Sequence, residues 1–192
     1  MTDLEAALTA LFSGDDSQAE AAIAILAAQA PSALPQLLSA LEDPHSDHRW
    51  WAARALAAID DPRVPPILQR ALADPDAAVR QCAALGLRLR PHPGAAADLV
   101  HMLNDRDRLT ARLAGDALAA LGAPATPLLV EALSSPQAAV RIEASRALAS
   151  IQDKESIGAL IAAVDDPSAV VQYWAEEALD RMGVGMVYFK PG

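Results

Sequence analysis

The residues of this sequence that could take part in chemistry are four histidines, His45, His48, His92 and His101, and one cysteine. His45 and His48 lie three positions apart with Asp47 between them, and side chains at that spacing can converge on one metal ion. The same spacing occurs in many ordinary loops that lead into helices. We therefore predict a solvated turn at this point and no metal site.

The single cysteine, Cys82, excludes a disulfide within the chain and an all-cysteine zinc site. A nucleophilic cysteine needs a neighbouring base, and the sequence implies none near Cys82, so we expect a partly buried, inert thiol. No Ser-His-Asp constellation and no glycine loop for phosphate is evident. We therefore predict no catalytic residues, no cofactor and, as the leading hypothesis, no enzymatic activity.

The elements that would position these residues come from a repeated motif. The segment Leu72-Ala-Asp-Pro-Asp-Ala-Ala-Val-Arg80 recurs in four further copies, at 41–49, 103–111, 133–141 and 164–172. Its proline, or the arginine that replaces it in one copy, falls at positions 44, 75, 106, 136 and 167. The steps of 31, 31, 30 and 31 residues indicate an array of structural repeats.

Each copy predicts two helices. Asp-Pro is expected to open the first helix, because Asp accepts hydrogen bonds from exposed amides and Pro at the first helical position loses no needed donor. An alanine three residues after the motif's arginine and a leucine seven residues after it share one face of this helix. The second helix follows a short break, often marked by another cap such as Asp61 or Asp153.

These positions predict a core of aligned side chains. One hairpin cannot bury both of its apolar faces alone, so neighbouring hairpins must stack. On the first helices the expected ladders are Ala52, Ala83, Ala114, Ala144 and Ala175, and Leu56, Leu87, Leu118, Leu148 and Leu179. On the second helices they are Leu37, Leu68, Leu99, Leu129 and Leu160, and Leu41, Leu72, Leu103, Leu133 and Val164.

The predicted fold is all-α: a right-handed α-α superhelix, or solenoid, of about five to six short hairpins of 30–31 residues. Residues 1–192 would form one domain. We expect an N-terminal capping helix over about 3–13, repeats over about 15–182 and a C-terminal tail over 183–192. Gly183 should stop the last helix, and the apolar tail would either cover that helix or contact another molecule.

The pattern Asp-Pro-x-x-x-Val-Arg-x-x-Ala-x-x-x-Leu resembles the short HEAT-like repeats named after phycobilisome (PBS) bilin lyases. These are shorter than ordinary HEAT repeats of about 40–47 residues. The resemblance covers roughly residues 15–182 and implies the fold, whereas proteins with such repeats include lyase subunits, a hydroxylase and scaffolds. The hydroxylase relatives bind iron through His-Glu pairs, and this sequence has no His-Glu dipeptide, which removes that function.

By the same resemblance, the arginine of each copy would bond to acidic and carbonyl groups of the adjacent turns and form an Arg–Asp ladder. Ala111 and Gln172 replace this arginine in two copies. We expect a looser ladder there, with Arg112 as a partial substitute for Ala111. The arginines of the ladder would be Arg49, Arg80 and Arg141.

Two aromatic pairs occupy the same two positions of the repeat, directly after the position of the motif's arginine. One member of each pair should pack between helices, and the other should lie exposed at an edge. The pairs either fill gaps in an alanine-rich stack or anchor a binding partner. The possible anchors are Trp50, Trp51, Tyr173 and Trp174.

In a HEAT-like stack the second helices line the concave face. With the leucine ladders in the core, their remaining positions form a strip of small and mildly apolar residues, which suits a peptide or helix better than a nucleic-acid backbone. Its polar side chains either bind a partner or are merely solvated. They are Arg70, Asp98, His101 and Glu131.

Charge and hydropathy narrow the classes of partner. The formal net charge of −10 argues against a general nucleic-acid binder. No uninterrupted apolar run approaches the roughly 18 residues of a membrane span, and the N-terminal segment lacks the basic region of a signal peptide. We expect a cytoplasmic protein, a monomer or weak homo-oligomer, that binds neither nucleic acid nor membranes.

The leading functional hypothesis is a non-catalytic protein–protein interaction scaffold that binds a peptide, helix or domain on its concave face. The step from fold to function is analogy, because one fold serves many functions. The alternative is a bilin lyase-like enzyme or accessory subunit. The identity of the protein partner is open.

Overall fold

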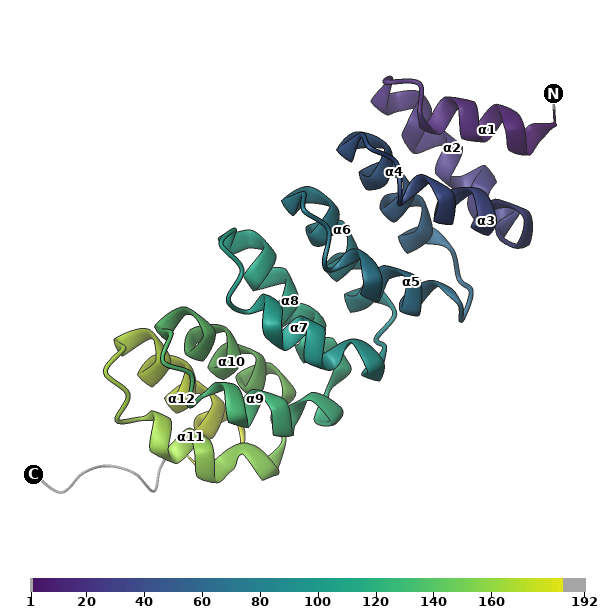
Figure 1. Ribbon diagram of the computed structural model, residues 1–192. Helices are drawn as coiled ribbons and strands as arrows, with labels where there is room; N and C mark the ends of the chain where they lie inside the picture. Colours follow the sequence, from purple (N-terminus) through teal and green to yellow (C-terminus); the bar gives the residue numbers. More distant parts are fainter. Residues whose placement is uncertain (1, 185–192) are drawn as a thin grey trace, which may run out of the picture. The chain divides into compact units, whose positions relative to one another are not determined.

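The computed structural model describes residues 2–184, and every regular element in that part of the chain is helical (Figure 1). The contacts divide the chain into two compact units, residues 1–92 and 93–192, which are described separately. The single domain and the right-handed superhelical sense therefore stay predictions.

The first unit contains α1 (Asp3–Leu11), α2 (Asp16–Ala28), α3 (Ala30–Ala40), α4 (Ser46–Ala58), α5 (Val64–Ala71) and α6 (Ala77–Leu89). The second contains α7 (Ala96–Met102), α8 (Arg108–Leu121), α9 (Thr126–Ala132), α10 (Ala138–Ile151), α11 (Ile157–Ala163) and α12 (Ala169–Arg181), with short 3₁₀ turns before α7, α9 and α11.

Each unit arranges its helices in two rows. In the first unit α2, α4 and α6 pack side by side, and α3 and α5 pack against them (Figure 1). In the second unit α8, α10 and α12 form the equivalent row, with α7, α9 and α11 packed against it. The lone second helix predicted for the N-terminus is α1, which packs on α2, and the lone first helix predicted near the C-terminus is α12. The predicted stack of two-helix repeats is thus confirmed within each unit.

The Asp-Pro pairs lie upstream of the first helices. The N-cap of α6 is Asp76, whose carboxylate accepts hydrogen bonds from the amides of the first turn. Asp74 instead accepts the amide hydrogen bond of Asp76, at 2.8 Å, and so forms the turn that precedes the helix. The same displacement is found before α4, α8 and α12. The prediction that Asp-Pro itself opens the helix is wrong by two residues, because the aspartate bonds an amide of the turn and not of the helix.

The last described helix ends as the sequence predicts. Gly183 has a φ of 75°, a left-handed conformation that glycine adopts at little cost. Its amide donates to the carbonyl of Asp180, and the amide of Val184 donates to the carbonyl of Leu179, both at 2.9 Å. Together these bonds complete a Schellman motif, so Gly183 is confirmed as the helix stop. The predicted function of the tail, as a cover or a contact, falls on residues 185–192, outside the described residues.

The core consists of the predicted ladders. All five alanines and all five leucines of the first helices are buried, as are all five leucines of the main ladder on the second helices. In the other ladder of the second helices, Leu72 and Leu103 are buried, while Leu41, Leu133 and Val164 are partly buried. All five residues of this ladder are the C-caps of their helices, so their burial varies from repeat to repeat at the same structural position.

Replacing Leu99 by alanine tests the main ladder of the second unit. Leu99 is 1% exposed, and removing a fully buried leucine side chain should lower the free energy of unfolding by about 2–5 kcal/mol, measured by urea titration. Leu109→Ala is the matched control, because Leu109 is 54% exposed and its loss should cost less than about 0.5 kcal/mol. Equal effects of the two substitutions would contradict the ladder assignment.

Candidate functional site

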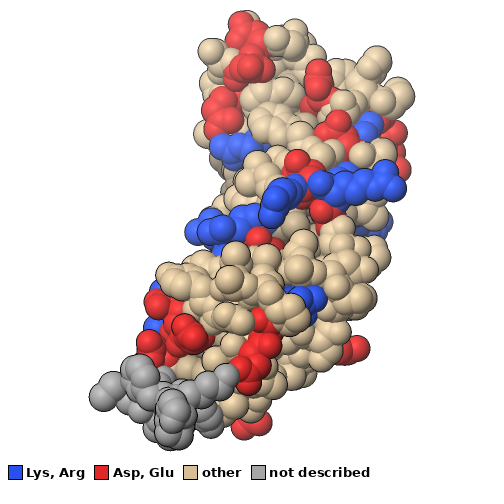
Figure 2. Space-filling view, turned by 90° about the vertical axis from the view of Figure 1, so that its left-hand side faces the viewer, with Lys and Arg blue, Asp and Glu red and all other residues tan. Residues whose placement is uncertain are grey.

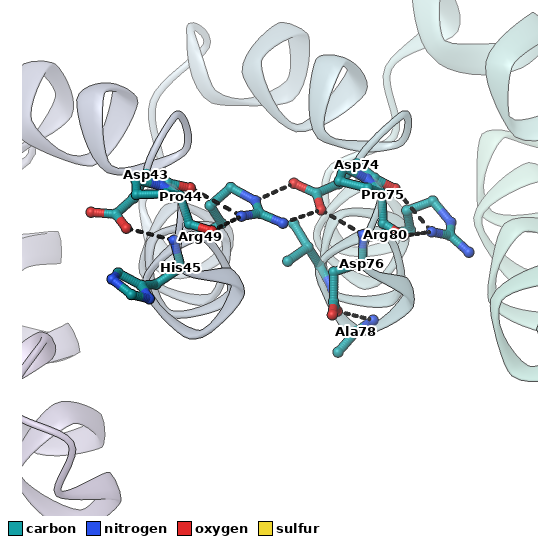
Figure 3. Close-up of polar contacts among 10 residues, drawn as sticks. Asp43, Pro44, His45, Arg49, Asp74, Pro75, Asp76, Ala78 and Arg80 are labelled. Carbon is teal, nitrogen blue, oxygen red and sulfur yellow. Dashed lines mark hydrogen bonds and ion pairs between the residues drawn. The ribbon is translucent and has the colours of Figure 1, made fainter.

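The most regular polar feature is an arginine–aspartate ladder between successive turns (Figure 3). In the first unit the guanidinium of Arg49 donates from Nε and Nη2 to the two carboxylate oxygens of Asp74, at 2.8 and 2.9 Å. Its Nη1 donates to the carbonyls of Asp43 and Pro44, at 3.0 and 3.2 Å. The Arg49 and Asp74 side chains are only 12% and 8% exposed. Such a shielded, bidentate pair is a strong and directional contact.

The second unit repeats this geometry. Arg141 donates from Nε and Nη2 to the carboxylate of Asp166, at 2.7 and 3.0 Å, and from Nη1 to the carbonyls of Ser135 and Pro136. The hydrogen bonds from Arg141 hold the pKa of Asp166 below its ordinary value. The ladder side chains are engaged with one another, so they position the turns and are not available as a binding site.

The two broken copies differ from the ladder in different ways. Gln172 donates from Nε2 to the carbonyl of Asp166 at 2.7 Å, and so keeps one of the carbonyl bonds that the arginine makes elsewhere. The prediction that Arg112 partly substitutes for Ala111 is wrong. The Nε of Arg112 lies 3.9 Å from Asp116, one turn along the same helix, because its side chain follows the helix surface away from the turn.

A buried arginine in the second unit was missed by the sequence analysis. Arg146 on α10 donates to Glu143, to Asp116 and to the carbonyl of Arg112 on α8, at 2.8, 2.6 and 2.9 Å. A Cβ at Gly115 would lie 2.9 Å from Nη2 of Arg146, so glycine leaves the space that the guanidinium needs. The only signal in the sequence was a glycine one residue before an aspartate on α8, and the repeat pattern gives no reason to connect it with Arg146.

The predicted groove residue Arg70 is exposed on α5 and lines a cleft in the first unit. No hydrogen bond or ion pair of its guanidinium is found among the described residues. The cleft has a volume of about 280 Å³ and lies between α3 and α5, together with the turns that follow them. We call it the arginine cleft, and its lining is Leu38, Leu41, Glu42, Arg49, Ile67, Arg70, Ala71, Ala73, Asp74 and Pro75.

The other predicted groove residues belong to the second unit. Asp98 and His101 are exposed on α7, one turn apart, and Glu131 is exposed on α9, which packs against α7. All three therefore present polar groups to solvent on second helices, and their place in a binding groove stays a prediction.

The aromatic pairs differ in exposure. Trp50 and Trp51 are both partly buried, with ring centroids 4.7 Å apart and planes at 80°, and Trp50 packs on the core residues Ala53, Val79 and Cys82. Tyr173 is 56% exposed, whereas Trp174 is partly buried. The predicted arrangement of one inner and one exposed ring is therefore found in the second unit. It is wrong for the first unit, where both rings are partly buried.

The two tryptophans line a second cleft of the first unit. It has a volume of about 420 Å³ and lies between the α1–α2 turn and the first turns of α4. The predicted solvated turn adjoins this cleft. The ring centroids of His48 and Phe12 are 5.1 Å apart, and Nδ1 of His48 lies 3.1 Å from a carboxylate oxygen of Asp43. The ring of His45 lies edge-on against that of His48. We call this the aromatic cleft, and its lining is Phe12, Ser13, Gly14, Asp16, Asp47, His48, Trp50 and Trp51.

Reactive groups show no catalytic arrangement in the described part of the chain. Cys82 is buried, and burial raises the pKa of its thiol to about 11, so at neutral pH it is protonated and a poor nucleophile. Within residues 2–184, no three His, Cys, Asp or Glu side chains are grouped so as to hold a metal ion. None of the helices in this range has both the length and the apolarity to cross a membrane.

Sequence comparison decides the family. The model of HEAT repeats matches residues 4–88, 64–136 and 96–180, three overlapping ranges that together cover most of the chain. The chain belongs to the HEAT repeat proteins. The curated proteins contain no significant match to its sequence.

Several solved structures share this fold. One chain in the structure of the complex of CpcE and CpcF of phycocyanin lyase from Nostoc sp. PCC7120 is 26% identical to this protein. Its TM-score is 0.56, and the match covers 95% of this chain and 77% of that chain. The Escherichia coli protein YibA is 19% identical, with a TM-score of 0.64 over 97% and 73%. A designed armadillo repeat protein in complex with the peptide (KR)4 is 20% identical, with a TM-score of 0.55 over 94% and 100%. The likeness to the lyase chains confirms the resemblance to PBS-lyase HEAT-like repeats.

The ladder of the second unit predicts a specific response to acid. A carboxylate whose pKa is lower in the folded state stabilises that state above its unfolded pKa, and the stabilisation is lost as the pH falls through the folded pKa. Because the pKa of Asp166 is lowered, we expect the free energy of unfolding to drop below about pH 4, and to drop less steeply in Asp166→Asn. Urea titrations at a series of pH values measure both slopes.

Glu176→Gln is the control for this experiment, because it removes the same charge from an exposed position of α12. The free energy of unfolding of this variant should depend on pH as steeply as that of the wild type. If Asp166→Asn kept that dependence as well, the ion pair with Arg141 would not contribute to acid stability.

Proposed function

We propose that this HEAT repeat protein is a non-catalytic scaffold that binds a protein partner on the exposed face of its second helices. The observation that carries the proposal is Arg70, a solvent-exposed guanidinium without a partner in the described structure, at the margin of the arginine cleft. An exposed arginine beside a cleft that also offers apolar side chains is a frequent anchor in protein interfaces.

The lining of the arginine cleft suggests what it binds. Leu38, Leu41 and Ile67 supply an apolar wall, while the ladder pair fixes the turns at its base. Arg70 would form a charge-assisted hydrogen bond with a carboxylate of the partner, and the wall would cover an adjacent apolar side chain. A peptide or helix with an acidic residue next to an apolar residue meets both requirements.

The second unit would contribute contacts of its own. Asp98, His101 and Glu131 are exposed on its second helices, and they would bind polar groups of a partner there. The designed armadillo protein holds the peptide (KR)4, and the lyase structure is a complex of two subunits, so proteins with this fold bind other chains. This support is analogy at the level of the fold. We further propose that the protein acts in the cytoplasm, as a monomer or weak homo-oligomer, without nucleic acid or membrane.

Charge reversal at Arg70 tests the scaffold function. Affinity capture from native lysate with quantitative mass spectrometry should yield a partner that binds the wild type and is lost, by about tenfold or more, with Arg70→Glu. Arg88→Glu is the control, because Arg88 is an exposed arginine of the same unit outside the arginine cleft. Binding of the purified partner should follow the same order. Equal capture by all three proteins would remove the arginine cleft from the binding site.

A second candidate function rests on the 26% identity to the phycocyanin lyase chains over 95% of this chain. On this alternative the protein would be a bilin lyase-like enzyme or an accessory subunit. Co-expression with bilin and a phycocyanin subunit should then give covalently attached pigment, seen as visible absorbance on the denatured acceptor. Absence of that absorbance, with a known lyase as positive control, would exclude the alternative for this acceptor.

A further inference from the structure

We propose that the aromatic cleft of the first unit binds the cationic side chain of an arginine from a partner protein. This site is distinct from the arginine cleft, and the inference does not depend on the function proposed above. Three features of the cleft support it: fixed aromatic walls, two carboxylates for which the described part of the chain offers no partner, and a lining without lysine or arginine.

The aromatic walls are held in place by their own contacts. Trp50 packs on Ala53, Val79 and Cys82, and Trp51 lies against it at nearly a right angle, so the two indoles turn their faces in different directions. On the other side, Phe12 contacts the ring of His48. A guanidinium over the face of an indole is attracted by the negative charge of the π system, and tryptophan is the strongest partner of this kind.

The α1–α2 turn brings Phe12 to this cleft. Gly14 has a φ of 79°, a left-handed conformation that permits the tight reversal between α1 and α2. Phe12 is the C-cap of α1, and the next helix starts at Asp16. One short turn therefore supplies both an aromatic ring and a carboxylate to a cleft whose other wall is α4.

The two carboxylates of the cleft are those of Asp16 and Asp47. Each is exposed, lies in the first turn of its helix, and makes no hydrogen bond or ion pair within residues 2–184. Acidic side chains form separate patches on the face shown in Figure 2, so the local charge of a cleft, not the net charge, decides what it attracts.

Other occupants fit the aromatic cleft less well. An anion would meet two carboxylates and no cationic side chain apart from His48, which is already engaged with Asp43. The amides at the start of α2 are taken by the Asp15 carboxylate, which accepts hydrogen bonds from Ser17 and Gln18. An arginine is preferred to a lysine, because its planar group can stack on an indole while its N–H groups bond to a carboxylate.

The test uses the indole N–H signals of the ¹H–¹⁵N NMR spectrum. The chain has three tryptophans, so three such signals are expected, and single Trp→Phe variants assign them. The probe is acetyl-Gly-Arg-Gly-amide, whose only charged group is the guanidinium of its arginine. We expect the signals of Trp50 and Trp51 to shift in a saturable manner, and the signal of Trp174, in the second unit, to stay in place.

Two controls separate a cation site from a general attraction. The same peptide with citrulline, which has the shape of arginine without its charge, should bind about tenfold more weakly or worse. Asp16→Asn/Asp47→Asn should weaken binding of the arginine peptide about tenfold, whereas Asp3→Asn/Asp60→Asn, which removes two exposed charges elsewhere in the same unit, should change it by less than about twofold. Circular dichroism checks that both double variants keep their helical signal.

Several results would overturn the proposal. Equal binding of the citrulline peptide would show an apolar slot, and equal losses in the two double variants would show non-specific attraction to an acidic protein. Shifts confined to Trp174, or no shift of any indole signal, would show that the aromatic cleft takes no arginine. Because the capture experiment with Arg70→Glu concerns the arginine cleft, either site can fail without the other.

Discussion

Close packing of the first helices through alanine is the constraint on which the rest of each unit depends. Ala52 and Ala83 in the first unit, and Ala114, Ala144 and Ala175 in the second, are completely buried. A side chain of one carbon lets neighbouring helices approach closely, and the leucine four residues on then fills the space toward the second helix. A larger residue at any of these positions would push two repeats apart, because packed interiors leave little room for added methylenes.

This close approach explains the arginine–aspartate ladder. Asp74 follows Arg49 by 25 residues, and Asp166 follows Arg141 by the same interval, so each pair joins one turn to the next. The bidentate geometry exists only where stacking has already fixed the distance between the turns. The ladder is therefore a consequence of packing that in turn sets the direction in which each first helix begins. Arginines at the ends of α6 and α12 add a similar link, since Arg90 and Arg181 donate to carbonyls near the C-terminal ends of α4 and α10.

The repeat made much of the fold predictable, and its exceptions marked the limits. Every buried ladder position, the lone helices α1 and α12, and the helix stop at Gly183 follow from periodicity and known capping chemistry. The first helices begin two residues later than the Asp-Pro pairs predicted. A carboxylate can accept a hydrogen bond from an amide of a turn or of a helix, and the sequence does not distinguish the two. The Arg146 network was missed, because it depends on Gly115 of the preceding repeat leaving space for a guanidinium.

The candidate clefts show why function was harder to predict than fold. Trp50 and Trp51 share a pattern by their repeat positions, whereas the cleft they line also needs Phe12, the C-cap of α1, and Asp16, the first residue of α2. The ladder residues, which recur in most copies, are engaged with one another, as Arg49 and Asp74 are. Arg70, Asp16 and Asp47, whose charged groups have no partner among residues 2–184, lie at positions where the copies differ. In a chain of this kind the shared pattern defines the scaffold, and the departures from it are where binding specificity should be sought.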